Sequence, residues 1–317
     1  MAPGLPCRKQ SSVVPLKHKR YTERPWNSEG RRMTIALGML ASTGVVLATD
    51  TEESWGDVGD IKTATTKMIS VSRKEVTGNS FCMAVAGAGN SDYLQRVKLE
   101  LAAKVFASPT WRFETSSDMV EEYLLKFYGD HITPFWPDVK DFQLIAGVAG
   151  STQGHLWITD KTTVVPCPYG YEAVGVGRAY ATALLSRFHS TGMNLESCSL
   201  LAIHVVHCVK EFIGGCGKQT HVVACTAENN VHLNPAKVDE AERLLKKLFA
   251  IDHSVVSFAI SYRPAFAGIA HAANKLREDL KGLDLLNRAE QPNPQSTTAD
   301  LTPPPPSQES PGGSGEF

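Results

Sequence analysis

The chain has 317 residues, a hydrophobic share of 42% and a formal net charge of −1 at pH 7. This length and composition allow a sizeable core, in one large domain or two small ones. The charge balance excludes a general attraction to nucleic acid or to an acidic membrane, and no apolar run approaches the ~20 residues of a membrane helix. The seven cysteines form no CxxC pair, which favours reduced thiols and a cytoplasmic protein.

The composition divides the chain into three zones. Residues 1–32 are polar and basic, with eight Lys or Arg against two Glu, and predict a disordered extension. A docking arm, a removable propeptide and a mis-assigned start of translation are the alternatives for this segment. Residues 288–317 are rich in Pro, Ser and Gly and predict a disordered tail. The foldable part therefore spans 33–287.

The first half of the foldable part reads as strands followed by two helices. Apolar runs of strand length predict strands at 33–41, 44–51, 66–72 and 80–88. The first two are joined by a turn at 42–44, and a glycine-bearing loop follows at 54–60. Helical spacing of apolar residues, with a capping Asn or Ser near each start, predicts helices at 89–107 and 116–131.

The second half repeats this order. Strands are predicted at 141–150, 154–160 and 171–177 and twice within 220–234, and helices at 178–188, 194–215, 236–249 and 266–287. Runs of strands that alternate with paired helices predict an α+β fold in which two sheets lie between two helical layers. The amphipathic helix at 266–287 either docks on its own subunit or contacts another one.

Several short motifs, in this order, resemble one family. They are Thr34, the run TGVVLATD at 43–50, Lys67 in TTKMISV, and the glycine-bearing turns AVAGAGNSD at 84–92 and VGVGRAYA at 174–181. The chain from about 33 to 250 resembles a proteasome β-type subunit of the bacterial-proteasome-like kind, an N-terminal-nucleophile threonine peptidase. The spacing from Thr34 to Asp50 is the family's spacing, and Asp50 to Lys67 is one residue longer.

The resemblance implies a fold, an activity and partners. The fold would be a four-layer αββα sandwich of the N-terminal-nucleophile hydrolase type. The protein would hydrolyse peptide bonds in peptides or unfolded proteins, inside a homo-oligomeric ring, with an ATPase unfoldase as a plausible partner. No cofactor, metal, nucleic acid or membrane is expected.

The implied catalytic residues fit the chemistry of a threonine nucleophile. A threonine hydroxyl needs a base, and the α-amine of an N-terminal Thr34, with an ordinary pKa of ~7.7–8.0, would lie within reach. Lys67 would place a cation beside the hydroxyl, and Asp50 would hold Lys67 through a charge-assisted hydrogen bond. Backbone N–H groups at Gly87 and Gly89 would face the oxyanion of the tetrahedral intermediate.

Two departures from the family pattern bear on activity. Met33 precedes Thr34, where self-processing members carry Gly, so that removal of an initiating Met33 is an alternative route to a free Thr34. Around the terminal amine, Val176 stands in place of one family serine, a second family serine has no clear counterpart, and Glu211 is matched to the family's aspartate. These departures keep two alternatives open: an inactive structural subunit or scaffold, and an amidohydrolase that acts on small amides.

The substrate pocket is the least defined part of the expected site. By the same alignment Glu53 and Thr65 fall near positions that line the pocket, and Glu53 would favour basic side chains. The one-residue insertion blurs this register, and a solvated surface position is the alternative for Glu53.

Other reactive side chains have simpler roles than catalysis or metal binding. His204, His207 and Cys208 share the helix at 194–215, but a closed metal site needs more ligands than this stretch offers. Core packing or a helix-surface role is the simpler interpretation of these three. Cys216 follows the C-terminal end of a helix, where the helix dipole disfavours a thiolate nucleophile.

Overall fold

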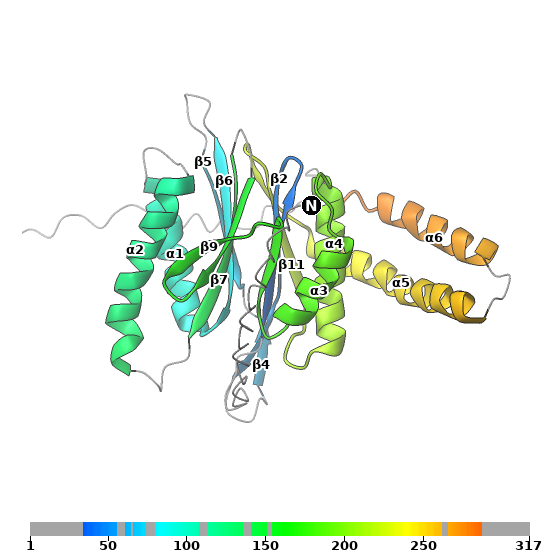
Figure 1. Ribbon diagram of the computed structural model, residues 1–317, viewed down its shortest axis with the longest axis horizontal. Helices are drawn as coiled ribbons and strands as arrows, with labels where there is room; N and C mark the ends of the chain where they lie inside the picture. Colours follow the sequence, from blue (N-terminus) through cyan, green and yellow to red (C-terminus); the bar gives the residue numbers. More distant parts are fainter. Residues whose placement is uncertain are drawn as a thin grey trace, which may run out of the picture.

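The computed structural model describes residues 34–55, 61–64, 66–73, 80–107, 113–135, 141–150, 154–261 and 266–286. These residues form two antiparallel five-stranded sheets, a separate two-stranded ribbon and six α-helices. Figure 1 shows the two sheets facing each other, with α1 and α2 outside one of them and α3 and α4 outside the other.

The first sheet carries the beginning of the described chain. Its strand order is β10-β1-β2-β11-β12, and β1 lies antiparallel to β2 with Leu37 opposite Ala48. The strands are β1 (Ile35–Ala41), β2 (Gly44–Asp50), β10 (Tyr171–Gly175), β11 (Thr220–Cys225) and β12 (Asn230–His232).

The second sheet has the order β5-β6-β7-β8-β9, and each strand follows its neighbour in the sequence. All neighbours in this sheet are antiparallel, and the chain passes through α1 and α2 between β6 and β7. The strands are β5 (Met68–Arg73), β6 (Phe81–Gly89), β7 (Phe142–Ala149), β8 (Gly154–Asp160) and β9 (Thr163–Pro166). The separate ribbon pairs β3 (Glu52–Trp55) with β4 (Ile61–Ala64).

The helices come in three consecutive pairs. They are α1 (Ser91–Ala107), α2 (Phe113–His131), α3 (Arg178–Phe188), α4 (Leu195–Phe212), α5 (Pro235–Ser261) and α6 (Phe266–Lys281), and a short 3-10 helix follows α2 at Thr133–Phe135. The Asn90 side chain accepts from the backbone N–H groups of Asp92 and Tyr93, and Asn194 caps α4 by accepting from Ser197 N. Both are the short polar side chains that favour a helix start.

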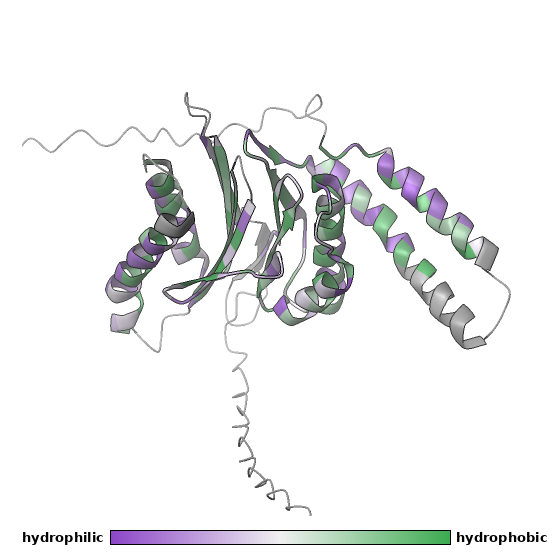
Figure 2. Cartoon of the chain, turned by 45° about the horizontal axis from the view of Figure 1, so that its top comes forward, coloured by the Kyte–Doolittle hydropathy of each residue, from purple (hydrophilic) through white to green (hydrophobic). Residues whose placement is uncertain are grey.

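Buried strands explain why the apolar runs in the sequence are nearly continuous. In β2, Val46 and Ala48 pack toward α4, whereas Val45 and Leu47 pack toward the other sheet. A strand that is covered on both faces needs apolar residues at every position. Figure 2 shows hydrophobic residues throughout both sheets, while the outer helices also carry hydrophilic ones.

Small residues let the two sheets approach each other. The cluster between them contains many alanines, and Gly147 of β7 lies under Leu47 of β2. A Cβ at Gly147 would lie 2.7 Å from Leu47 Cδ1, so the Leu47 side chain fills the space that the glycine leaves. The packing of one sheet on the other therefore depends on this large-to-small contact.

The observed architecture corrects the expectation of a four-layer αββα sandwich. The described residues do form an α+β arrangement, but the two five-stranded sheets are accompanied by the β3–β4 ribbon and by a third helix pair, α5 and α6. In Figure 1 these two helices extend away from the sheets, beyond α4. A plan with two helical layers has no place for this pair.

Other differences concern single elements. The sequence indicated none of β3, β4 and β9, and each has only four residues, too few for a clear alternation. The loop predicted at 54–60 is wrong at its start, because β3 extends to Trp55. Helix α5 runs on to Ser261, well past the predicted end at 249. The predicted extension 1–32 and tail 288–317 lie outside the described residues. Among the described helices, none combines the length and the hydropathy that crossing a membrane requires.

The Leu47–Gly147 contact gives a prediction about stability. Leu47 is fully buried between the sheets, so Leu47→Ala should lower the free energy of unfolding by about 2–5 kcal/mol. The control is Leu125→Ala on α2, whose side chain is 65% exposed and should change stability by less than about 0.5 kcal/mol. Urea unfolding curves measure both values, and equal losses would contradict the packing described here.

Candidate active site

Three residues that are distant in sequence meet at the edge of the two facing sheets. Thr34 directly precedes β1, Asp50 is the last residue of β2, and Lys67 directly precedes β5 of the opposite sheet. Because β1 and β2 are antiparallel neighbours, the start of one lies beside the end of the other, and Ile35 N donates to Asp50 Oδ1 at 3.1 Å. Lys67 reaches this point from across the interface.

The Lys67 ammonium is the centre of the arrangement. Its Nζ lies 2.7 Å from Thr34 Oγ1 and 2.9 Å from Asp50 Oδ1, and it also donates to the backbone carbonyl of Glu52. Three acceptors match the three donors of an ammonium group. All three side chains are buried, with exposed fractions of 5% for Thr34, 0% for Asp50 and 7% for Lys67.

Backbone groups complete the environment of the Asp50 carboxylate. Oδ1 accepts from Ile35 N, and Oδ2 accepts from Gly217 N at 3.0 Å. Burial raises the pKa of Asp50, and the Lys67 ammonium and the two N–H groups oppose this effect by favouring the ionised form. The ion pair is therefore held by hydrogen bonds on both of its carboxylate oxygens.

The backbone of Thr34 is fixed by the turn after β10. Val176 N donates to the Thr34 carbonyl at 3.0 Å. Gly175 has φ +99°, and a Cβ there would lie 2.1 Å from the Thr34 carbonyl oxygen, so only glycine fits. The Val176 side chain is 40% exposed and carries no polar group, so Val176 can hydrogen-bond to Thr34 through its main chain alone.

Two buried residues near the site were not singled out from the sequence. Glu52 is 5% exposed, and its carboxylate would lie 2.2 Å from a Cβ placed on Gly217. The sequence signal was available, because Glu52 follows Asp50 by two residues, the spacing that keeps side chains on one face of an extended chain. Gly217 carried no such signal, because its contact with Asp50 is made by a backbone N–H that every residue except proline has.

Cys216 lies beside these groups with its thiol protected. Its side chain is 6% exposed, and burial, followed by the nearby Asp50 carboxylate, raises its pKa to about 12. A thiol with this pKa is protonated at neutral pH and is a poor nucleophile. The environment of Cys216 therefore disfavours a cysteine mechanism.

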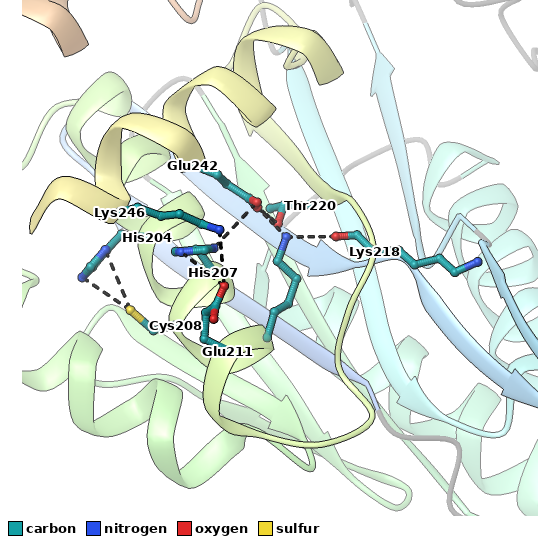
Figure 3. Close-up of polar contacts among 9 residues, drawn as sticks. His204, His207, Cys208, Glu211, Lys218, Thr220, Glu242 and Lys246 are labelled. Carbon is teal, nitrogen blue, oxygen red and sulfur yellow. Dashed lines mark hydrogen bonds and ion pairs between the residues drawn. The ribbon is translucent and has the colours of Figure 1, made fainter. Parts of the chain in front are cut away.

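Glu211, which the sequence analysis matched to a catalytic aspartate, does not join this site. It lies near the end of α4 with half of its side chain exposed, 3.5 Å from Lys246 Nζ and 4.0 Å from His207 Nε2 (Figure 3). Within the described residues it makes no contact with Thr34 or Lys67. The match is corrected because α4 directs Glu211 toward α5.

The predicted oxyanion glycines lie at the end of β6, and their packing explains why they are glycines. A Cβ at Gly87 would lie 2.4 Å from Leu94 Cδ2, and one at Gly89, where φ is +117°, would lie 2.4 Å from the Asp141 carbonyl. Ala88, between them, approaches Gly175 beside Thr34. The end of β6 is thus adjacent to the Thr34 backbone, and the oxyanion role stays a prediction.

Of the two residues predicted to line the substrate pocket, Glu53 and Thr65, the structure describes only the backbone of Glu53. Glu53 belongs to β3 and pairs with Thr63 of β4, and its side chain is outside what the structure describes. Thr65 lies outside the described residues. Their predicted role in a substrate pocket stays a prediction.

The histidine and cysteine side chains on α4 form no group of metal-binding size. Cys208 Sγ lies 3.6 Å from His204 Nε2, as Figure 3 shows. In the part of the chain that the structure describes, no set of three or more His, Cys, Asp or Glu side chains converges to hold a metal ion.

Comparisons with known proteins show the fold. The structure is similar to Anbu from Hyphomicrobium sp. strain MC1, in a Gly-1 mutant (TM-score 0.59, 15% identity, covering 71% of this chain and 96% of that chain) and in a second crystal form (TM-score 0.56, 15% identity, covering 71% and 97%). It is also similar to Anbu from Yersinia bercovieri, described as an ancestral beta-subunit (TM-score 0.57, 13% identity, covering 70% and 97%). No model of a known protein family matches the sequence, and no curated protein matches it.

These findings correct the resemblance drawn from the sequence. Membership of the proteasome β-type family, in its bacterial-proteasome-like form, is not supported, because no family model matches and the similar structures are Anbu proteins. The motifs around Thr34, Asp50 and Lys67 are short, and the similar structures share only 13–15% of their residues with this chain. What the comparisons show is that this chain has a fold similar to that of Anbu.

Proposed function

We propose that this protein is an amide-bond hydrolase of the threonine type, with Thr34 Oγ1 as its nucleophile. The observation that carries the proposal is the 2.7 Å contact between Lys67 Nζ and Thr34 Oγ1, next to a fully buried Asp50. A buried lysine that points at a threonine hydroxyl lowers the cost of forming an alkoxide there. A purely structural ion pair would not need the hydroxyl.

The proposed reaction uses the α-amine of Thr34 as the base. Once the bond between Met33 and Thr34 is cleaved, this amine takes the proton from Oγ1 as Oγ1 bonds to the substrate carbonyl carbon. The tetrahedral intermediate then expels the amine product, which receives that proton, and an ester on Thr34 remains. Water attacks the ester carbonyl with the α-amine again as base, and this step releases the acid and restores the hydroxyl.

Lys67 and Asp50 act through charge in this proposal. The Lys67 ammonium stabilises negative charge on Oγ1 and disfavours a second positive charge on the neighbouring α-amine. Asp50 keeps the ammonium in place, since its Oδ1 accepts from Lys67 and its Oδ2 is held by Gly217. The base, the nucleophile and the charge that supports them then form one unit.

We propose peptides or unfolded proteins as substrates, with small amides as the alternative class. We also propose a homo-oligomeric ring served by an ATPase unfoldase, because the similar protein from Yersinia bercovieri is described as a beta-subunit, a part of an assembly. A cytoplasmic location is consistent with the free thiols of the six described cysteines. Light scattering on the purified protein tests the assembly, and a monomeric mass would exclude it.

A catalytically inactive scaffold is the second candidate. Two observations favour it: Val176 offers no hydroxyl beside Thr34, and Glu211 pairs with Lys246 elsewhere. Without these groups the α-amine has fewer polar neighbours to orient it. The labelling experiment below separates the two candidates.

The first prediction concerns the nucleophile. A β-lactone probe should add to Thr34 in protein whose mature chain begins at Thr34, because only then is the base present. Peptide mapping by mass spectrometry locates the adduct, which should be lost in Thr34→Ala and kept in Thr34→Ser. A mature chain that retains residues 1–33, or correctly processed protein that stays unlabelled, would favour the scaffold.

The second prediction concerns the lysine. Lys67→Met removes the charge beside Oγ1 and should lower kcat/KM for a reactive peptide substrate by roughly 10²–10³-fold. The matched control is Lys247→Met, which removes an exposed ion pair with Asp279 on the outer helices and should leave kcat/KM unchanged. Wild-type activity in folded Lys67→Met would contradict the proposed role of the charge.

The third prediction separates threonine from cysteine chemistry. Because the pKa of Cys216 is about 12, iodoacetamide at pH 8 should leave this thiol unmodified in the folded protein and should not reduce hydrolysis. Unfolded protein is the control, since Cys216 should then react. Loss of activity together with alkylation of Cys216 would point to a cysteine nucleophile.

A further inference from the structure

A second polar cluster lies behind the candidate active site, where α4, α5 and the start of β11 meet. Figure 3 shows Glu242 of α5 directed toward Thr220, with Lys218 on the loop that leads into β11. Its central pair is Lys210 of α4 and Glu242, whose side chains are 10% and 15% exposed. The mechanism proposed above does not use this pair.

The Lys210–Glu242 pair connects two helices to one loop. Lys210 Nζ lies 2.6 Å from Glu242 Oε1 and donates to the backbone carbonyl of Lys218 at 3.0 Å. Glu242 Oε1 also accepts from the Thr220 hydroxyl. His207 Nδ1 lies 3.8 Å from Glu242 Oε2, farther away than Lys210, and burial lowers the pKa of this imidazole.

The loop held in this way is the one that reaches Asp50. Lys218 has φ +57°, a left-handed conformation that a lysine adopts only when its surroundings hold it there. The residue before it, Gly217, donates its N–H to Asp50 Oδ2. Gln219, the residue after it, exchanges hydrogen bonds with Thr51, at 3.0 and 3.1 Å. Lys218 thus lies between the two residues whose backbones meet Asp50 and Thr51, so its left-handed conformation sets the course of the loop between these contacts.

We propose that Lys210 and Glu242 are positioning residues that keep the Gly217 N–H on Asp50 and thereby align Lys67 with Thr34. The effect on catalysis rests on the proposed function, whereas the anchoring of the Gly217 N–H on Asp50 does not depend on it. The path runs from Glu242 through Lys210 to the Lys218 carbonyl, then through Gly217 to Asp50, and every link is a hydrogen bond or a peptide bond.

A merely structural role explains the pair less well. A buried ion pair is often no more stabilising than an apolar pair of the same size, so joining α4 to α5 does not require charges. The same two helices are also joined by Lys246 and Glu211. Their side chains are 58% and 50% exposed, and this pair makes no described contact with the loop. Of the two charged pairs between these helices, the Lys210–Glu242 pair is the one that bonds to the loop backbone, through Lys210 and the Lys218 carbonyl.

The test compares three variants of the processed protein, whose chain begins at Thr34. Lys210→Met removes the donor to the Lys218 carbonyl but leaves Glu242 buried without its cation. Lys210→Met with Glu242→Gln removes that unpaired charge as well, so it should regain stability while the loop stays unanchored. Lys246→Met is the matched control on the same helix pair. If the single variant does not fold, the double variant carries the test.

Two readouts distinguish positioning from stability. Hydrogen exchange at the Gly217 amide should quicken by about tenfold or more in both Lys210 variants, and labelling of Thr34 by a β-lactone should slow by roughly 10- to 100-fold. Both readouts should stay at wild-type values in Lys246→Met, and the melting temperature should recover in the double variant.

Each contrary outcome has a distinct meaning. The positioning proposal is overturned if hydrogen exchange at Gly217 is unchanged in the Lys210 variants. It is also overturned if the double variant regains Gly217 protection and Thr34 labelling together with its melting temperature. Faster Gly217 exchange in a protein whose wild-type form is never labelled supports the positioning of Asp50 and overturns the proposed hydrolase function instead.

Discussion

The buried contact between the Lys67 ammonium and the Asp50 carboxylate is the interaction on which the site depends. Both groups are removed from water, which costs several kcal/mol per ion unless each charge finds partners. Lys67 meets this demand with three acceptors, and one of them is the hydroxyl of Thr34. Asp50 meets it with Lys67 and two backbone N–H groups. The same bonds that make the ion pair tolerable therefore place a cation on a threonine oxygen, an arrangement with a direct use in acyl transfer.

The fold supplies the rigid frame for this contact. Thr34 and Asp50 come from neighbouring strands of one sheet, while Lys67 comes from the other, so the site exists only when the sheets are stacked. The alanine-rich cluster between the sheets, with Leu47 over Gly147, sets their separation. On the far side of the first sheet, α4 and α5 hold the loop before β11 through Lys210. Long-range packing and a local loop conformation thus act on the same carboxylate.

The sequence predicts the individual strands and the motif residues of the site, but few of the contacts between distant elements. Strand β2 could be predicted because it is a run of apolar residues that ends in Asp50, and the motif spacing drew attention to Thr34 and Lys67. Strand β4 has only four residues, which is too short for a strand pattern to be recognised in the sequence. The α5–α6 pair adds an element that the expected sandwich lacks. Glu211 was wrongly assigned to the site, because its position along the helix does not show which way its side chain points. The Gly217 contact depends on a left-handed Lys218, a conformation that the residue type does not indicate.

The most direct test of the central claim is a crystal structure of the processed protein after reaction with a β-lactone. We expect continuous electron density from Thr34 Oγ1 into the acyl group, a free Thr34 α-amine beside it, and Lys67 Nζ within hydrogen-bond distance of both Oγ1 and Asp50. An acyl group on any other side chain, or a Lys67 ammonium turned into solvent away from Thr34, would contradict the central claim.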